Sequence, residues 1–150
     1  MVETTSLPQT YSLRVSTNIY QLNEVHTWFS QFSQFKHVPH NVWMQCNLVL
    51  TEGFTNVICH AHEFLPEATP VDIEVTFLEG ALELRIWDFG QPFDLKAELD
   101  RLSQQTFNPL DIDSIPTGGR GLAIANTVSD YFSYDRTTDG RNCFLIRKNY

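Results

Sequence analysis

The stretch VDIEVTFLEGALELRI, residues 71–86, decides the fold class of this chain. Apolar residues occupy every second position over 71–77 and again over 82–86, which is the period of a strand with one face buried. Glu79 and Gly80 stand between the two runs and are typical of a tight turn. We therefore predict a β-hairpin at the centre of the chain.

The segment before the hairpin begins with a short strand and continues as a helix. Apolar and polar residues alternate over 11–16, and apolar residues then recur at helical spacing from Ile19 to Phe32. Thr17 and Asn18, directly before this stripe, are plausible N-caps. A strand followed by an amphipathic helix is therefore expected here.

The remaining elements complete a layered fold. A second helix is expected over about 41–62, and a polar, proline-containing connection over 91–117. A further helix follows over about 122–131, and a turn at 139–140 leads into a last strand that ends at Lys148. This order predicts an α+β fold: a two-layer α/β sandwich in which a mixed, mostly antiparallel sheet carries helices on one face.

Composition and charge exclude several classes of protein. Ten Lys and Arg against 18 Asp and Glu give a formal net charge of -8, and the basic residues do not cluster, so we expect no direct nucleic-acid partner. No apolar run approaches the roughly 20 residues of a membrane span. Residues 1–10, an expected N-terminal tail, lack a secretory signal. We expect a cytoplasmic protein with a single domain over 11–150, and its three scattered cysteines do not indicate a disulfide framework.

The second predicted helix carries a polar stripe. Glu52, Asn56 and His60 are spaced by four, which places a carboxylate, an amide and an imidazole on one helix face. Such a stripe often simply faces water, and a histidine at a helix end often only caps it. Gly53 costs a helix about 1 kcal/mol relative to alanine, which is tolerated where close packing or a ligand requires a missing side chain.

Two glycine-containing motifs follow this stripe. Asp88, Phe89 and Gly90 end the hairpin, where an aspartate either binds its own backbone or faces a ligand. The residues of 118–122, Gly-Gly-Arg-Gly-Leu, precede the next helix and act either as a hinge or as a cradle for phosphate at the helix start. The pattern is not that of a P-loop or a dinucleotide fingerprint, and the other protein-kinase motifs are missing.

Zinc is an alternative for the histidines and cysteines between residues 37 and 62. Its ligands would have to converge from a loop and one helix, and His60 and His62 are poorly spaced for one helical face. We therefore do not expect a zinc site.

In this order, the three motifs resemble the N, G1 and G2 boxes of the GHKL superfamily of ATPases and kinases. Within this superfamily, the chain resembles the bacterial anti-sigma factor serine/threonine kinases. The resemblance rests on the sequence of 118–122, on Gly140-Arg141-Asn142 and on the short single domain. The resemblance covers about 11–148. It departs at Pro92, where the superfamily prefers a glycine, and at Arg141, where it prefers a threonine.

The resemblance implies a Bergerat-type ATP-binding fold with ATP and Mg²⁺ as cofactors. Asn56 would coordinate Mg²⁺, Asp88 would accept a hydrogen bond from the adenine amino group, and Gly90 would pass under the base. The segment of about 95–117 would close as a lid. The implied ATP-binding residues are Asn56, His60, Asp88, Gly90, Gly118, Gly119, Arg120, Gly121 and Leu122.

The resemblance also implies a function. The protein would be an anti-sigma regulatory kinase that phosphorylates an anti-anti-sigma STAS-domain protein on Ser or Thr, with Glu52 as general base. Its further partners would be a sigma factor and a second copy in a homodimer. The alternatives are a non-catalytic ATP-binding interaction module and a trans-acting histidine-kinase-like ATPase domain, and the presence of Glu52 favours the enzyme.

Overall fold

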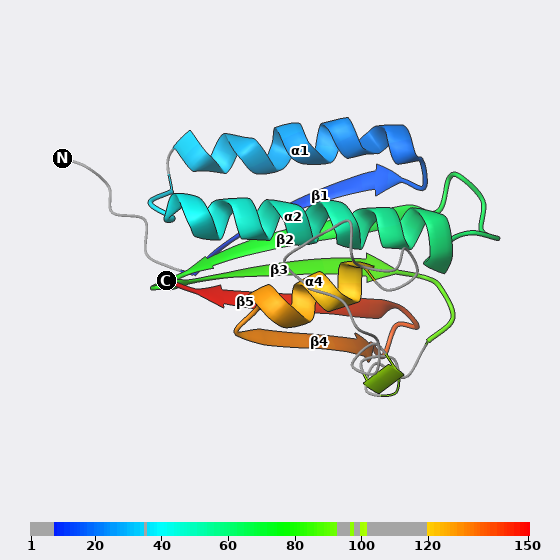
Figure 1. Cartoon of the computed structure of the whole chain (residues 1–150). Helices are drawn as coiled ribbons and strands as arrows, with labels where there is room; N and C mark the ends of the chain where they lie inside the picture. The colour runs from blue at the N-terminus through cyan, green and yellow to red at the C-terminus, as the bar shows by residue number, and fades with distance from the viewer. Residues whose placement is uncertain (1–7, 35, 93–96, 98–99, 102–119) are drawn as a thin grey trace.

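A computed structural model describes residues 8–34, 36–92, 97, 100–101 and 120–150 (Figure 1). Its sheet has five strands in the order β1-β2-β3-β5-β4. All four neighbouring pairs are antiparallel, so the described sheet contains no parallel pair and, unlike the expected sheet, is not mixed. The strands are β1 (Gln9–Ser16), β2 (Pro70–Leu78), β3 (Ala81–Asp88), β4 (Tyr131–Arg136) and β5 (Asn142–Asn149).

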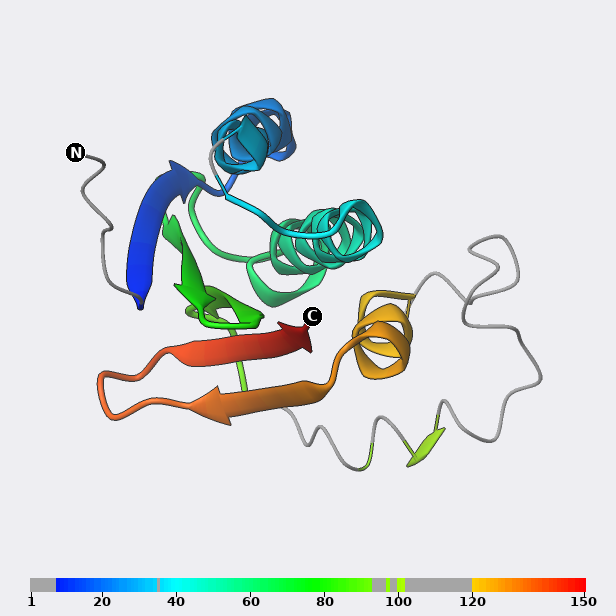
Figure 2. The ribbon, with the colours of Figure 1, turned by 90° about the vertical axis from the view of Figure 1, so that its left-hand side faces the viewer.

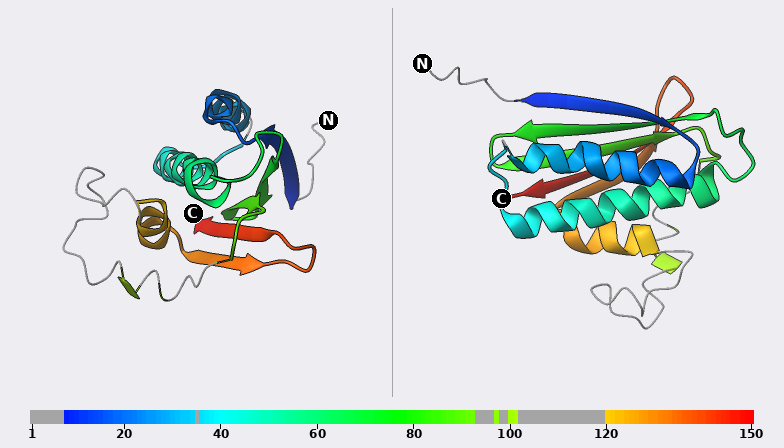
Figure 3. Two further views of the ribbon diagram at one scale, coloured as in Figure 1. Left: turned by 90° about the vertical axis from the view of Figure 1, so that its right-hand side faces the viewer. Right: turned by 90° about the horizontal axis from the view of Figure 1, so that it is seen from above.

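The helices lie on one face of this sheet and leave the other face open (Figures 2 and 3). The predicted α+β class is therefore confirmed, and the core lies between the two layers. None of the helices in the described ranges has the length and apolarity needed to span a membrane. The helical elements are η1 (Ile19–Gln21), α1 (Leu22–Ser30), η2 (Gln31–Gln34), α2 (His40–Asn56), the π-helix η3 (Val57–Ala61) and α4 (Arg120–Val128).

The predicted hairpin is the pair β2–β3. Every second residue of β2 is buried against the helices, as the alternation predicts. Gly80 in the turn has a φ of 71°, a conformation that favours glycine. The first strand begins at Gln9, opposite Phe77, so β1 includes two residues that the sequence analysis assigned to the tail.

Two helix predictions need correction. The Asn18 side chain accepts from the N–H of Tyr20 at 2.9 Å and caps η1, as expected, whereas the hydroxyl of Thr17 caps nothing and donates to a carbonyl in the loop before β2. The last helix ends at Val128 instead of about 131, and the N–H of Asp130 already donates to a carbonyl of β5 at 2.9 Å. The helical periodicity predicted another turn after Val128, but the backbone there pairs with β5 instead.

The second helix lies very close to the sheet because residue 53 is glycine. A Cβ on Gly53 would lie 2.8 Å from Cδ1 of Ile86 and 3.5 Å from the ring of Phe144. This helix continues from α2 into the wider turn of η3, a local change that often accompanies functional sites. Close packing thus explains Gly53, and it holds the end of the helix over β3 and β5.

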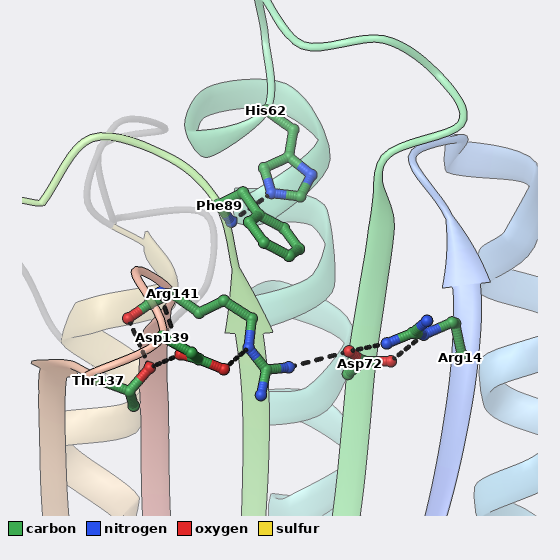
Figure 4. Close-up of polar contacts among 7 residues, drawn as sticks. All are labelled: Arg14, His62, Asp72, Phe89, Thr137, Asp139 and Arg141. Carbon is green, nitrogen blue, oxygen red and sulfur yellow. Dashed lines mark hydrogen bonds and ion pairs between the residues drawn. The ribbon is translucent and has the colours of Figure 1, made fainter.

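The open face of the sheet carries a row of charges (Figure 4). The carboxylate of Asp72 pairs with Arg14 at 2.7 Å and with Arg141 at 3.0 Å, and Arg141 also contacts Asp139 at 2.7 Å. The guanidinium of Arg141 stacks over the ring of Trp87, 5.4 Å from its centroid. Arg141 therefore belongs to this ion-pair row.

Candidate functional site

A cavity of about 360 Å³ lies where the end of the second helix meets the ends of β3 and β4. Its walls combine apolar side chains with a few polar groups, which is the usual composition of a small-molecule site. The lining residues are Gly53, Asn56, Val57, His60, Ala61, Phe64, Asp88, Gln91, Tyr134 and Phe144.

The carboxylate of Asp88, at the last position of β3, is the charged group inside this site. Asp88 is 1% exposed, and burial of an ionised carboxylate is costly unless donors compensate it. Its Oδ1 accepts from the N–H of Gly90 at 2.8 Å and from Nδ2 of Asn142 at 2.9 Å, and its Oδ2 accepts from the hydroxyl of Tyr134 at 2.8 Å. Three donors therefore hold the carboxylate in one orientation.

Tyr134 donates its hydroxyl proton to Asp88 in this network. Its burial, followed by the negative charge of Asp88, raises the pKa of the phenol above its ordinary value, so the hydroxyl keeps its proton. With one donor on Oδ2, that oxygen retains capacity for one further hydrogen bond. The carboxylate can therefore receive one N–H from a ligand in the cavity.

Asn142 reaches Asp88 because of the sheet register. The two residues stand opposite each other in the β3–β5 pair, and Asn142 is completely buried. Its Nδ2 donates both to Asp88 and to the carbonyl of Gly90 at 2.9 Å. One amide group therefore ties the carboxylate to the turn that follows β3.

Gly90 allows this turn to lie directly on η3. A Cβ at position 90 would lie 2.7 Å from the carbonyl oxygen of Ala61 and 2.9 Å from its Cβ, closer than any side chain tolerates. The contact with Ala61 is therefore one physical requirement for glycine here. Its expected place under a nucleotide base stays a prediction.

Of the predicted polar stripe, Asn56 and His60 line the cavity, and Glu52 does not. Asn56 is half-buried, and no hydrogen bond joins its side chain to the residues that the structure describes. His60 is exposed at the rim. Glu52 is half-buried one turn earlier on α2 and has interactions of its own. The stripe thus contributes an amide and an imidazole to the cavity.

Comparison with known proteins agrees with this architecture. Residues 15–148 match the family model HATPase_c_2, described as the histidine kinase-like ATPase domain. This protein belongs to that family. The predicted relationship is thereby confirmed for nearly the whole chain, and the family places the protein among kinases and ATPases.

Solved structures show the same fold of the histidine kinase-like ATPase domain. A chain from "The crystal structure of SiaB-SiaC complex from Pseudomonas aeruginosa" superposes with a TM-score of 0.62 at 12% identity. The match covers 93% of this chain and 89% of that one. No curated protein sequence matches this chain.

The donor set of this histidine kinase-like ATPase domain fits a nucleotide that carries its own metal ion. Within the described ranges, no three His, Cys, Asp or Glu side chains gather to hold a metal. The oxygen of Asn56 is a hard ligand, and Mg²⁺ commonly takes only one or two protein oxygens beside phosphates and water. The residues present therefore suit Mg²⁺ bound together with a phosphorylated ligand.

The glycine-rich segment of this ATPase domain is described only in part. Gly118, Gly119 and nearly all of the predicted lid lie outside the described residues. Arg120, Gly121 and Leu122 form the first turn of α4. The start of α4 lies at the same end of the molecule as η3 and the end of β3 (Figures 1 and 3). The described part of the third motif, the first turn of α4, therefore lies at the same end of the fold as the other two motifs.

Three residues of this ATPase domain were not identified as site residues from the sequence. Tyr134 and Asn142 bind Asp88, and His62 binds the backbone of the turn after it. No local pattern marks them, because each contact joins segments far apart in the chain. Only Asn142 had a signal, since it belongs to the motif quoted for the family resemblance.

Proposed function

We propose that this protein is an anti-sigma factor regulatory kinase that binds Mg-ATP and phosphorylates a STAS-domain anti-anti-sigma protein on Ser or Thr. The observation that carries the proposal is the buried Asp88 carboxylate in a cavity also lined by Asn56. The family match supports ATP as the ligand. The fold shared with a chain of the SiaB–SiaC complex supports action on a partner protein.

The cavity has the features needed to bind adenine. The remaining acceptor capacity of Asp88 would take one N–H of the exocyclic amino group, which guanine lacks at that position. Val57, Ala61 and Phe144 supply apolar surface for a planar base. A 6-amino purine should therefore bind better than a 6-oxo purine.

Phosphate binding would use the second helix and α4. The carboxamide oxygen of Asn56 would hold Mg²⁺, which would offset charge on the transferred phosphoryl group. The start of α4 presents backbone N–H groups and the positive end of a helix dipole. Gly118, Gly119, Arg120, Gly121 and Leu122 are proposed to contact phosphate on this basis.

Glu52 is the proposed general base. In the transfer, the oxygen of a partner Ser or Thr would form a bond to the γ-phosphorus as the bond to ADP breaks, and Glu52 would take the hydroxyl proton. This role is supported by its position on α2, one turn before Asn56, which is the proposed Mg²⁺ ligand.

Phosphorylation would act as a switch between partners. A phosphate adds nearly two negative charges to the STAS protein, and this chain has a formal net charge of -8. The modified partner would be released by like-charge repulsion, which frees the kinase to hold a sigma factor. A homodimer in the cytoplasm is the proposed working form.

A non-catalytic ATP-binding module is the second candidate. The specific observation in its favour is that Glu52 lies outside the cavity lining. Such a module would use ATP only to shape the surface that holds its partner.

The two candidates are separated by mixing the purified protein with Mg-ATP and the STAS proteins of its own genome. Intact mass should show one added phosphate on a STAS protein with the wild type and with the control Glu63→Gln, an exposed position. Glu52→Gln should bind ATP but transfer no phosphate. If all three proteins bind ATP and no STAS protein is modified, the non-catalytic module is supported.

The metal role of Asn56 is tested by calorimetry. Asn56→Ala should lose Mg²⁺-dependent ATP binding, whereas Asn41→Ala, at an exposed position near the start of the same helix, should retain it. Unchanged affinity in Asn56→Ala would remove this residue from the proposed metal site.

A further inference from the structure

His62 is a buried histidine that does not line the cavity but contacts the backbone directly after Asp88, which does. It is 1% exposed and ends η3, and its backbone N–H donates to Val57 at 2.8 Å. Its ring joins two distant segments, because Nδ1 lies 2.9 Å from the hydroxyl of Thr17 and Nε2 accepts from the backbone N–H of Phe89 at 2.8 Å. Figure 4 shows the contact with Phe89.

The hydrogen bonds determine the tautomer of His62. The hydroxyl of Thr17 donates to the carbonyl of Thr69 at 2.6 Å, so it must accept from Nδ1–H of the imidazole. Nε2 then carries a lone pair, which receives the N–H of Phe89. Both ring nitrogens are therefore satisfied in the neutral histidine.

The bond to Phe89 orients the peptide that leaves Asp88. We call Asp88, Phe89 and Gly90 the 88–90 turn. The N–H of Phe89 belongs to the peptide plane between Asp88 and Phe89, so the bond to His62 restricts that plane. The next N–H, that of Gly90, is held by the Asp88 carboxylate itself at 2.8 Å. Two successive amides of the turn are thus fixed by side chains.

We propose that His62 is a positioning residue for nucleotide recognition. By holding the 88–90 turn, it aims the Asp88 carboxylate at the exocyclic amino group of the base, although His62 does not itself line the cavity. This inference rests on the proposed binding of ATP. It predicts that loss of the acceptor at Nε2 weakens recognition of that amino group specifically.

Two variants test the two hydrogen bonds of the His62 ring separately. In His62→Gln, the longer side chain reaches toward the Nε2 position and can still accept from Phe89. In His62→Asn, the shorter side chain reaches only toward Thr17, so the amide of Phe89 loses its partner. Calorimetry with Mg-ATP should give an affinity about tenfold lower for His62→Asn and close to the wild type for His62→Gln, since one buried hydrogen bond is at stake.

A nucleotide without the amino group tests the positioning role directly. Purine riboside triphosphate lacks the N–H donors that Asp88 would receive. Its affinity should be nearly equal for the wild type and His62→Asn, whereas ATP should distinguish them. A purely structural role would lower both affinities by the same factor, and that result would overturn the inference.

A second route covers failure of His62→Asn to fold. Thr17→Val removes the acceptor of Nδ1–H and should weaken ATP binding severalfold, whereas Thr27→Val, at an exposed position of α1, should not. Wild-type affinity in folded Thr17→Val, with His62→Asn unfolded, would overturn the inference. If the wild type itself binds no nucleotide, the proposed function is wrong, and this inference is wrong for the same reason.

Discussion

The hydroxyl of Tyr134 donates to Oδ2 of Asp88 at 2.8 Å, across 46 residues of sequence. The contact places a neutral donor from β4 against a carboxylate at the end of β3. It leaves that oxygen one further acceptor position, and both residues line the same cavity. Loss of this contact should lower the stability of the fold, and under the proposed function it should also weaken recognition of the base.

Replacement of Tyr134 by Phe should lower the free energy of unfolding by about 2 kcal/mol. The change removes a hydrogen bond to a buried charged group, and such bonds contribute about 1.5–3 kcal/mol. Urea unfolding measures the loss. Tyr131→Phe is the matched control on the same strand, since Tyr131 is 53% exposed. Equal stability of the two variants would contradict the network described for Asp88.

Gly90→Ala should destabilise the protein by about 1–3 kcal/mol, the usual cost of an added methyl group in a packed site. The added Cβ would lie 2.7 Å from the carbonyl oxygen of Ala61, and backbone cannot move aside cheaply. Ala61→Gly in the same chain should recover only part of the loss, because the carbonyl remains. Thermal unfolding of both variants tests this. Full recovery in the double variant would mean that the methyl group of Ala61 is the whole obstacle.

Acid should destabilise the protein through His62. Burial lowers the pKa of His62 from 6.5, while the nearby carboxylate of Asp88 opposes the shift, and Glu63 and Glu67 border the neighbouring pocket. Below pH 6.5 the unfolded chain takes up a proton that the folded protein resists, so stability is present above this pH and is lost as the pH falls below it.

The contribution of His62 is isolated by comparison with His62→Gln. Urea unfolding at pH 7.5 and 5.5 should show an extra loss in the wild type of at most about 1.4 kcal/mol, the free energy of one pH unit of protonation. The same pH dependence in both proteins would assign acid sensitivity to other groups.

The three cysteines should differ sharply in reactivity. Cys59 is exposed on η3, Cys46 is 1% exposed and Cys143 is half-buried. Burial raises the pKa of the Cys46 thiol to about 12 and that of Cys143 to about 11, so both stay protonated near neutral pH. At pH 8 a maleimide should therefore modify one thiol quickly, and peptide mass should locate it at Cys59. Rapid modification in the variant Cys59→Ser would refute this order.

The exposed Cys59 also shows a limit of sequence reasoning. Cys59 stands among apolar residues in the sequence, where a free cysteine usually packs as a small hydrophobe, but it is exposed on η3. The same limit applies to the last helix, which ends at Val128 because strand pairing with β5 begins two residues later. In both cases long-range packing decides what local pattern leaves open.

The sequence by itself determined the hairpin, the α+β class and the positions of Asn56 and Asp88 within their elements. These features follow from periodicities of two and 3.6 residues, which are local properties of a chain. Three motifs in a constant order were sufficient to indicate the histidine kinase-like ATPase family.

Only the tertiary structure decided which side chains surround Asp88. Asn142 reaches it through the β3–β5 register, Tyr134 through the next strand, and His62 through the packing of η3 on the 88–90 turn. These contacts join residues that are far apart in the sequence. The pairs His62–Phe89, Asp88–Tyr134 and Asp88–Asn142 are separated by 27, 46 and 54 residues. Hydrogen bonds over such separations depend on strand register and close packing, which no short stretch of sequence encodes.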